Sequence, residues 1–238
     1  MTFLHLLGWG EDSWSHQLFL GLVATVEISA GGYLVGLLIG GLGAWAKLRG
    51  GRRAVAIANA YSTVCRAVPE VLLIIILFYA GQSALDSIVE GLGYDPENVG
   101  ISGFAAAVIV LGLVQGAYAS EILRGAVLSI PRGQVEAAQA FGFHGFGLFR
   151  LIILPTLLPY ALGGLANLWM VIIKDSALIS VVGYNELLFT AKQGAGSTKY
   201  YFSFFLLAGG LYYIMTLLSN LVIHRIERRI RRWMPRVA

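Results

Sequence analysis

The chain has 238 residues, of which 57% are hydrophobic and 13% are charged, whereas soluble domains contain about 45–50% apolar and about 25% charged residues. This composition, with a net charge of +4, excludes an ordinary soluble domain. The single cysteine, Cys65, excludes an intrachain disulfide, no Cys-x-x-Cys or His-x-x-x-His spacing predicts a metal site, and the absence of a Gly-Lys dipeptide excludes a nucleotide-binding phosphate loop.

Five apolar runs are each long enough to cross a bilayer, which takes about 20 residues at a helical rise of about 1.5 Å. They cover residues 17–46, 55–84, 101–128, 151–173 and 200–223. The sequence therefore predicts an all-α membrane protein in which residues 1–238 form a single transmembrane domain with five membrane-spanning helices.

The basic residues predict the orientation of these helices. Residues 47–53, 124–150 and 225–238 contain 13 of the 17 Lys and Arg residues, whereas residues 1–46 and 85–100 contain none. Short loops rich in Lys and Arg stay in the cytoplasm. We therefore expect the N-terminus outside and the C-terminus inside the cell.

The first run contains three glycines spaced four residues apart, Gly32, Gly36 and Gly40, which predict close packing against another helix. It also contains Glu27, ten residues into the run and about 15 Å deep at helical rise. An ionisable group at that depth is costly unless it is paired or hydrated. Glu27 is therefore a candidate for a site inside the membrane.

The second run contains Arg66, Pro69 and Glu70 near its middle. Proline lacks an N–H group and strains the preceding helical turn, and transporters build binding sites at helix breaks of this kind. Arg66 and Glu70 are four residues apart, so a simple ion pair on one helix face is an equal alternative to a binding role.

Two more charged positions follow. Glu121, near the end of the third run, is three residues from Arg124, and this spacing favours a structural ion pair. Asp175 follows the fourth run, where it is expected to cap a short helix or to bind a ligand. Residues 194–199 are rich in glycine and predict a flexible connection.

The loop at residues 129–150 contains a helix of its own. Pro131 ends the preceding helix, Glu136–Phe141 consists of good helix formers, and Gly142 ends the segment. Three alanines and two nearby phenylalanines with one carboxylate make a smooth surface that another protein can bind. The alternative is a surface helix that folds back on its own bundle.

Four segments resemble permease subunits of binding-protein-dependent ABC importers, in the branch that includes histidine, arginine and opine permeases. They are Glu136-Ala137-Ala138 with Gly142 and Ile153-Leu154-Pro155; Arg66-Ala67-Val68-Pro69; Tyr118-Ala119-Ser120-Glu121-Ile122-Leu123-Arg124-Gly125; and Lys174-Asp175-Ser176-Ala177-Leu178-Ile179-Ser180. The likeness covers residues 17–232. It implies the MetI-like permease fold, with residues 129–150 as the coupling loop.

The resemblance implies a division of labour between subunits. Glu136, Ala137, Ala138 and Gly142 would pass ATP-driven motion from a separate ATPase to the membrane helices. The expected partners are two ATPase subunits that bind the ATP, a second permease subunit that is either a copy or a related chain, and an extracytoplasmic solute-binding protein. This chain itself is expected to bind no cofactor or metal and to make or break no bond, and its location is the bacterial inner membrane.

The same resemblance directs attention to the substrate. Many amino-acid permeases of this type have an apolar residue after the proline, where this chain has Glu70. A carboxylate in a cavity of low dielectric favours a cationic substrate, and Arg66 is suited to an α-carboxylate. With Glu27, and with Asp175 as a ligand for the amino group, these residues predict a site for histidine, lysine, arginine, ornithine or an opine. The sequence does not choose among these.

Two other functions compete with this reading. In a self-contained secondary transporter or channel, Glu27 and Glu70 would carry protons or ions, but five spans show no pair of internal repeats. A membrane enzyme acting on lipid would need carboxylates or histidines clustered at one level, and here they are scattered through different spans.

Overall fold

The computed structural model describes residue 8 and residues 13–92 and 102–231, and its regular elements in these ranges are helices. In chain order they are α2 (Trp14–Arg49), α3 (Arg52–Ala67), α4 (Glu70–Gly91), α5 (Gly103–Leu128), α6 (Arg132–Ala140), α7 (Gly145–Leu148), η2 (Phe149–Ile153), α8 (Leu154–Asp175), η3 (Ser176–Val182), α9 (Leu187–Thr198) and α10 (Tyr201–Arg231). Residue 101, where the third run was predicted to begin, lies outside the described residues.

Five helical segments of the described part are long and apolar enough to span a membrane, as predicted. They are Trp14–Arg49, Glu70–Gly91, Gly103–Leu128, Gly145–Val182 and Tyr201–Ile230. The fourth is longer than predicted because α7, the π-helical turn η2, α8 and the 3-10 helix η3 follow one another without a break.

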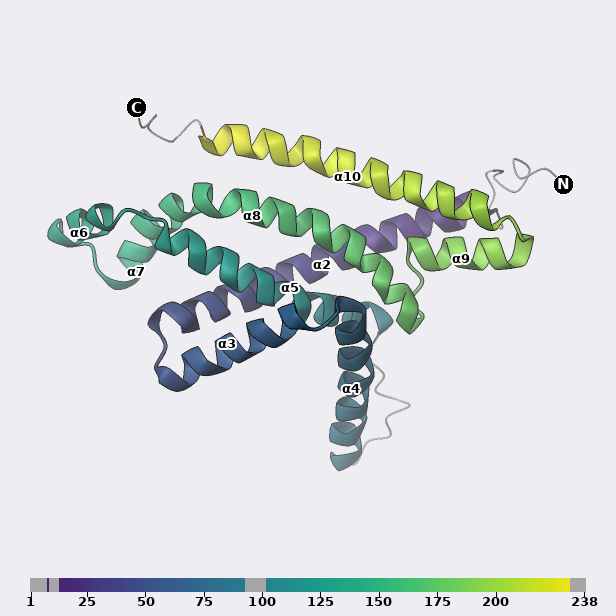
Figure 1. Cartoon of the computed structure of the whole chain (residues 1–238), viewed down its shortest axis with the longest axis horizontal. Coiled ribbons are helices and arrows are strands. Elements are labelled where there is room, and N and C mark those ends of the chain that lie inside the picture. The colour runs from purple at the N-terminus through teal and green to yellow at the C-terminus, as the bar shows by residue number, and fades with distance from the viewer. Residues whose placement is uncertain (1–7, 9–12, 93–101, 232–238) are drawn as a thin grey trace.

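The second predicted span, residues 55–84, is wrong as a single helix. Helix α3 ends at Ala67, Val68 is extended with φ −93° and ψ 139°, and α4 begins only at Glu70. A residue before proline is driven into the extended region by the proline ring, so Pro69 separates two helices instead of kinking one. Helix α3 runs beside α2, whereas α4 leaves the bundle and runs across its long axis (Figure 1).

The predicted close packing at the glycines of α2 is confirmed. On the facing side of α5, Leu111, Gln115 and Ala119 lie against Gly32, Gly36 and Gly40 in that order. A Cβ atom on Gly32 would lie 2.9 Å from the Leu111 Cβ, and one on Gly36 would lie 3.1 Å from the Gln115 Cβ. The glycines thus let the two backbones approach closely, and α5 becomes the most buried of the candidate spans.

The two ends of the bundle differ in charge and content. The α2–α3 turn, helices α6 and α7 and the end of α10 lie at one end, and α9 lies at the other (Figure 1). The first group includes the segments that carry most of the Lys and Arg residues. The described parts of the basic segments that the sequence assigns to one compartment are therefore gathered at one end of the molecule.

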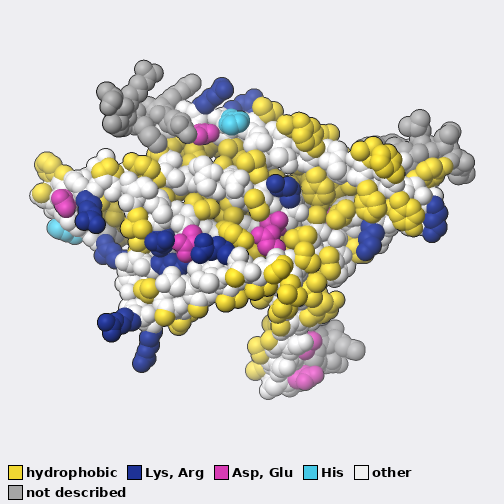
Figure 2. Space-filling view, in the orientation of Figure 1, with side chains coloured by type: hydrophobic (Ala, Val, Ile, Leu, Met, Phe, Trp, Pro, Cys, Tyr) yellow, Lys and Arg dark blue, Asp and Glu magenta, His cyan; other side chains and the backbone are white. Residues whose placement is uncertain are grey.

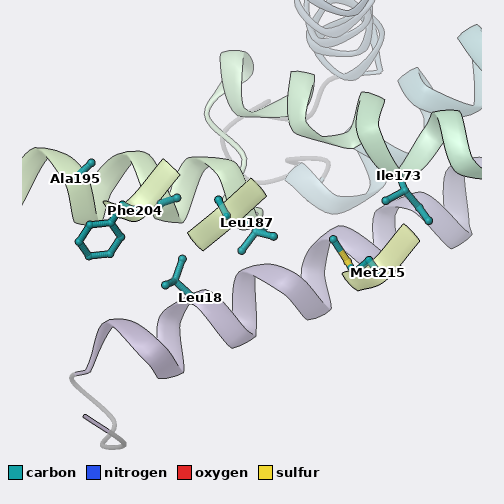
Figure 3. Packing of buried hydrophobic residues seen from close by; sticks show 8 residues of the cluster. Leu18, Ile173, Leu187, Ala195, Phe204 and Met215 are labelled. Atoms are coloured by element: carbon teal, nitrogen blue, oxygen red, sulfur yellow. The ribbon is translucent and has the colours of Figure 1, made fainter. Parts of the chain in front are cut away.

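Helix α9 is fastened to its neighbours by an apolar cluster and a buried carboxylate. The cluster joins α2, α8, α9 and α10 through Leu18, Ile173, Leu187, Ala195, Phe204 and Met215 (Figure 3). Glu186 caps α9 by accepting hydrogen bonds from the backbone N–H groups of Leu188 (2.8 Å) and Phe189 (2.7 Å), and it accepts another from the Tyr212 hydroxyl (2.7 Å). Burial raises the pKa of Glu186.

The flexible connection predicted at residues 194–199 is wrong. Helix α9 continues to Thr198, and Lys199 ends it in the left-handed region with φ 65°. Tertiary packing explains the difference: a Cβ on Gly194 would collide with the Phe204 ring, so the glycine is there to make room for that ring.

Candidate functional site

The charged side chains of the bundle form two groups around α5. The first, which we call the charged cluster, consists of Lys47, Arg66, Glu121 and Arg124. The second, the acidic pair, consists of Glu70 and Asp175. Figure 2 shows basic and acidic side chains gathered in the middle of a face that is otherwise largely hydrophobic.

Glu121 of α5 is the centre of the charged cluster. Its Oε1 lies 2.6 Å from the Lys47 Nζ and 3.7 Å from an Arg66 guanidinium nitrogen, and its Oε2 lies 3.0 Å from an Arg124 guanidinium nitrogen. The Lys47 ammonium also donates to the hydroxyls of Ser62 (2.6 Å) and Ser120 (3.2 Å). The cluster therefore joins α2, α3 and α5, and the predicted pair of Glu121 with Arg124 is confirmed.

Sequence reasoning missed Lys47 as a member of this cluster. It was counted among the basic residues of residues 47–53, yet its side chain is only 2% exposed. Its position was the available signal, because Lys47 belongs to the last turn of the long apolar helix α2, two residues before the helix ends. A lysine there can turn its ammonium back toward the bundle.

Helices α4, α5 and α8 build the acidic pair. Glu70 is the first residue of α4, and its Oε1 accepts a hydrogen bond from the Tyr118 hydroxyl at 3.1 Å. Asp175 is the last residue of α8, and its Oδ2 accepts one from the Gln115 Nε2 at 2.7 Å. Tyr118 and Gln115 lie one turn apart on α5, and the two carboxylates are close enough to interact electrostatically.

The structure does not adopt two of the structural alternatives left open by the sequence. Arg66 and Glu70 form no ion pair within 4 Å, because the break at Pro69 places them on different helices and Arg66 turns to Glu121. Asp175 makes no side-chain hydrogen bond as a cap of η3. Both carboxylates are therefore half-buried and held by α5.

Arg66 and Glu27 stand apart from the acidic pair. The Arg66 side chain is 44% exposed, and its Nε donates to the Ser62 carbonyl at 3.1 Å. Glu27 is exposed on α2 and has no hydrogen bond or ion pair with another described residue. Burial and the nearby charge of Glu27 raise the pKa of Tyr184, so Glu27 lies close to that residue. Of the four predicted substrate-binding residues, only Glu70 and Asp175 are brought together.

The segment predicted to couple to an ATPase forms a well-defined helical turn. Gly142, with φ 87°, ends α6 through hydrogen bonds from its own N–H to the Gln139 carbonyl (2.9 Å) and from the Phe143 N–H to the Ala138 carbonyl (3.1 Å). This is the pattern of a Schellman motif. Ala138 is buried, Glu136 and Ala137 are exposed, and Phe141 is 86% exposed. The turn thus presents apolar surface outward from the end of the bundle.

The charged cluster and the acidic pair differ in whether their carboxylates have cationic partners. Glu121 has three cationic neighbours, whereas within residues 13–92 and 102–231 neither Glu70 nor Asp175 has a Lys, Arg or His partner within 4 Å. Neutral donors stabilise a carboxylate without cancelling its charge. The acidic pair is therefore suited to receive a cation from outside the chain.

Comparison with known proteins gives consistent matches over nearly the whole chain. The family model described as "Binding-protein-dependent transport system inner membrane component" matches residues 32–232. The chain is 40% identical to the octopine transport system permease protein OccQ of Rhizobium radiobacter, over 99% of both chains. It is 37% identical to the histidine/lysine/arginine/ornithine transport system permease protein HisQ of Salmonella typhimurium, over 90% of this chain and 93% of that one.

Solved structures agree with the sequence relatives. A crystal structure of an amino acid ABC transporter with histidines matches with a TM-score of 0.78 at 25% identity, over 96% of this chain and 99% of that one. The MetNI methionine ABC transporter in an inward-facing conformation matches with a TM-score of 0.74 at 20% identity and shows the fold alone. The predicted MetI-like fold is confirmed.

Proposed function

Because the chain belongs to the family of binding-protein-dependent transport system inner membrane components, we propose that it is the permease subunit of an ATP-driven importer for a cationic amino acid or an opine. The named substrates of its relatives, octopine and histidine, lysine, arginine or ornithine, support this range. The proposed substrate-binding residues are Glu70 and Asp175, together with Arg66 for the α-carboxylate and Glu27.

One observation carries this proposal. Glu70 and Asp175 come from two different helix ends, lie together, and are held by hydrogen bonds from neutral groups only. Two adjacent carboxylates in a membrane bundle are unfavourable unless they share a proton or a cation compensates them. A guanidinium or ammonium group of the substrate supplies this charge and forms strong charge-assisted hydrogen bonds.

Uptake of labelled arginine by vesicles containing the complete transporter tests the proposal. Glu70→Leu is expected to lower uptake at least about tenfold, since it removes a hydrogen bond to a charged group. Glu90→Leu is the matched control, because Glu90 lies at the opposite end of the same helix α4. Unchanged arginine uptake by a normally assembled Glu70→Leu transporter would refute the substrate role.

The ATPase is proposed to be a separate chain that docks on the turn from Glu136 to Gly142. The exposed Phe141 and the alanines beside it support this, since apolar surface rimmed by polar residues is typical of protein interfaces. Phe141→Ala should reduce copurification of the ATPase. Phe202→Ala is the control: Phe202 is similarly exposed but begins α10, near α9 at the other end of the bundle (Figure 1). Equal loss in both variants would contradict this docking site.

A second permease subunit is proposed to pack on α4. Only 11% of the apolar window of this helix is buried within the chain, and Leu72, Ile76 and Tyr79 are about half exposed. A cysteine introduced at one of these positions in each permease chain should therefore form a cross-link between the two chains.

The gathering of basic segments at one end supports a cytoplasmic C-terminus and an outer N-terminus.

A self-contained secondary transporter remains the second candidate. It predicts arginine uptake without ATP or the solute-binding protein. The importer requires both, so uptake in vesicles that lack each component distinguishes the two functions.

A further inference from the structure

Helix α5 holds the acidic pair with two side chains that carry no charge. The Gln115 Nε2 donates to Asp175 at 2.7 Å, and the Tyr118 hydroxyl donates to Glu70 at 3.1 Å. Each carboxylate thus has its own donor, and both donors come from one face of one helix. The spacing of one turn on α5 sets the distance between the two carboxylates.

The orientation of Gln115 is determined by Asp175. Gln115 is completely buried, and its Oε1 has no hydrogen-bond partner among the described residues. A buried carbonyl oxygen without a partner costs free energy. The amide nevertheless places its nitrogen toward Asp175, because the amide nitrogen is the donor of this side chain and the Asp175 Oδ2 accepts its hydrogen bond. Gln115 lies against Gly36 of α2, so the backbone packing of α2 and α5 fixes this side chain.

Helix α5 also carries a carboxylate of its own, Glu121, which is bound by cations instead of neutral donors. One turn beyond Tyr118, Glu121 is bound by Lys47 and Arg124, and its charge is cancelled. A lysine or arginine in place of Gln115 would do the same to Asp175 and would compete with a cationic substrate. Neutral donors keep both carboxylates in place and leave their charge available.

We propose that Gln115 and Tyr118 are positioning residues that determine the preference of this permease for cationic substrates. They rank as positioning residues because they act through Asp175 and Glu70, and the inference rests on the substrate role proposed for these two carboxylates. Each donor fixes one carboxylate in the direction from which a guanidinium or ammonium group is bound.

Binding of labelled arginine and of its neutral isostere citrulline to the purified transporter, without the solute-binding protein, tests this inference. Gln115→Met is nearly isosteric but has no donor, and Tyr118→Phe removes only the hydroxyl. Each is expected to weaken arginine binding about tenfold, the lower range for a hydrogen bond to a charged group. Tyr118→Phe, which acts through Glu70, should change citrulline binding less than about twofold, whereas Gln115→Met should weaken it as well, because citrulline keeps the α-ammonium group assigned to Asp175. Ser29→Ala, which alters a buried polar group on α2 outside the site, is the control and leaves both affinities unchanged.

A double-mutant cycle separates positioning from a merely structural role. In an Asp175→Asn background, Gln115→Met is expected to have almost no further effect on arginine binding, because its effect passes through the carboxylate. Additive losses would overturn the inference, and so would equal losses of arginine and citrulline binding in Tyr118→Phe. If Gln115→Met fails to assemble, Tyr118→Phe and its cycle with Glu70→Gln decide the question.

Glu70→Gln distinguishes the failure of this inference from failure of the proposed function. If Glu70→Gln weakens arginine binding but Gln115→Met and Tyr118→Phe do not, the positioning role is wrong and the substrate site stands. If Glu70→Gln also leaves arginine binding unchanged, the substrate site is wrong and the positioning role falls with it.

Discussion

Two groups of charged residues packed around the same helix, α5, are stabilised in contrasting ways. In the charged cluster, Glu121 is paired with cations from its own chain, and the buried Lys47 is fully engaged. In the acidic pair, Glu70 and Asp175 receive only neutral donors. The comparison shows that one carboxylate joins three helices through cations of its own chain, whereas two neighbouring carboxylates have no such cation among the described residues.

The largest effect is expected from breaking the structural joint. Lys47→Met leaves Glu121 without its nearest cation and two serine hydroxyls without their donor. We expect a loss of about 2 kcal/mol of stability, below the value for a fully buried pair because Glu121 keeps Arg124. Thermal unfolding of the purified complex measures this. A variant as stable as the parent would show that the cluster contributes nothing to the joint between α2, α3 and α5.

The acidic pair should respond with the opposite sign. Asp175→Asn removes one of two neighbouring negative charges while an amide of nearly the same shape remains. We expect stability without ligand to rise by about 1 kcal/mol and arginine binding to weaken while staying measurable, the usual exchange between stability and function at a binding site. Thermal unfolding with and without arginine tests both parts, and a destabilised Asp175→Asn protein contradicts the comparison.

The smallest loss of stability is expected for Arg124→Gln, which tests whether the two cations of the charged cluster contribute unequally. Arg124 pairs with the same carboxylate as Lys47, but its side chain is 39% exposed. Exposed ion pairs contribute little, so Arg124→Gln is expected to lower stability by no more than about 0.5 kcal/mol. Its unfolding curve should lie between those of the parent and Lys47→Met. An equal loss in the two variants would mean that burial does not determine the strength of these pairs.

Local sequence signals predicted much of the fold because they depend on short-range chemistry. Apolar length gave the number of spans, Gly142 gave the end of α6, and the three glycines of α2 predicted close packing. The prediction of one span over residues 55–84 was wrong because apolar composition does not reveal a change of chain direction. Pro69 forces Val68 into an extended conformation, which separates two helices instead of kinking one. The prediction of a flexible connection at residues 194–199 was wrong because Gly194 makes room for the Phe204 ring, a contact between two helices that the local sequence does not show.

The candidate site was only partly within reach of the sequence. An acidic residue directly after Pro69 and an aspartate at the end of an apolar run identify Glu70 and Asp175, since charges in apolar surroundings need a reason. Nothing in the sequence assigns partners. In a continuous helix Arg66 would lie one turn from Glu70. The break between α3 and α4 separates them, and Arg66 pairs with Glu121 instead.

The sequence by itself determined that this chain is a five-span helical membrane protein, because apolar length and the placement of Lys and Arg act residue by residue against the bilayer. The tertiary structure decided which carboxylates are neutralised and which are left open. That outcome depends on distances of a few ångströms between helices far apart in the chain, and electrostatic energy in a medium of low dielectric changes steeply over such distances.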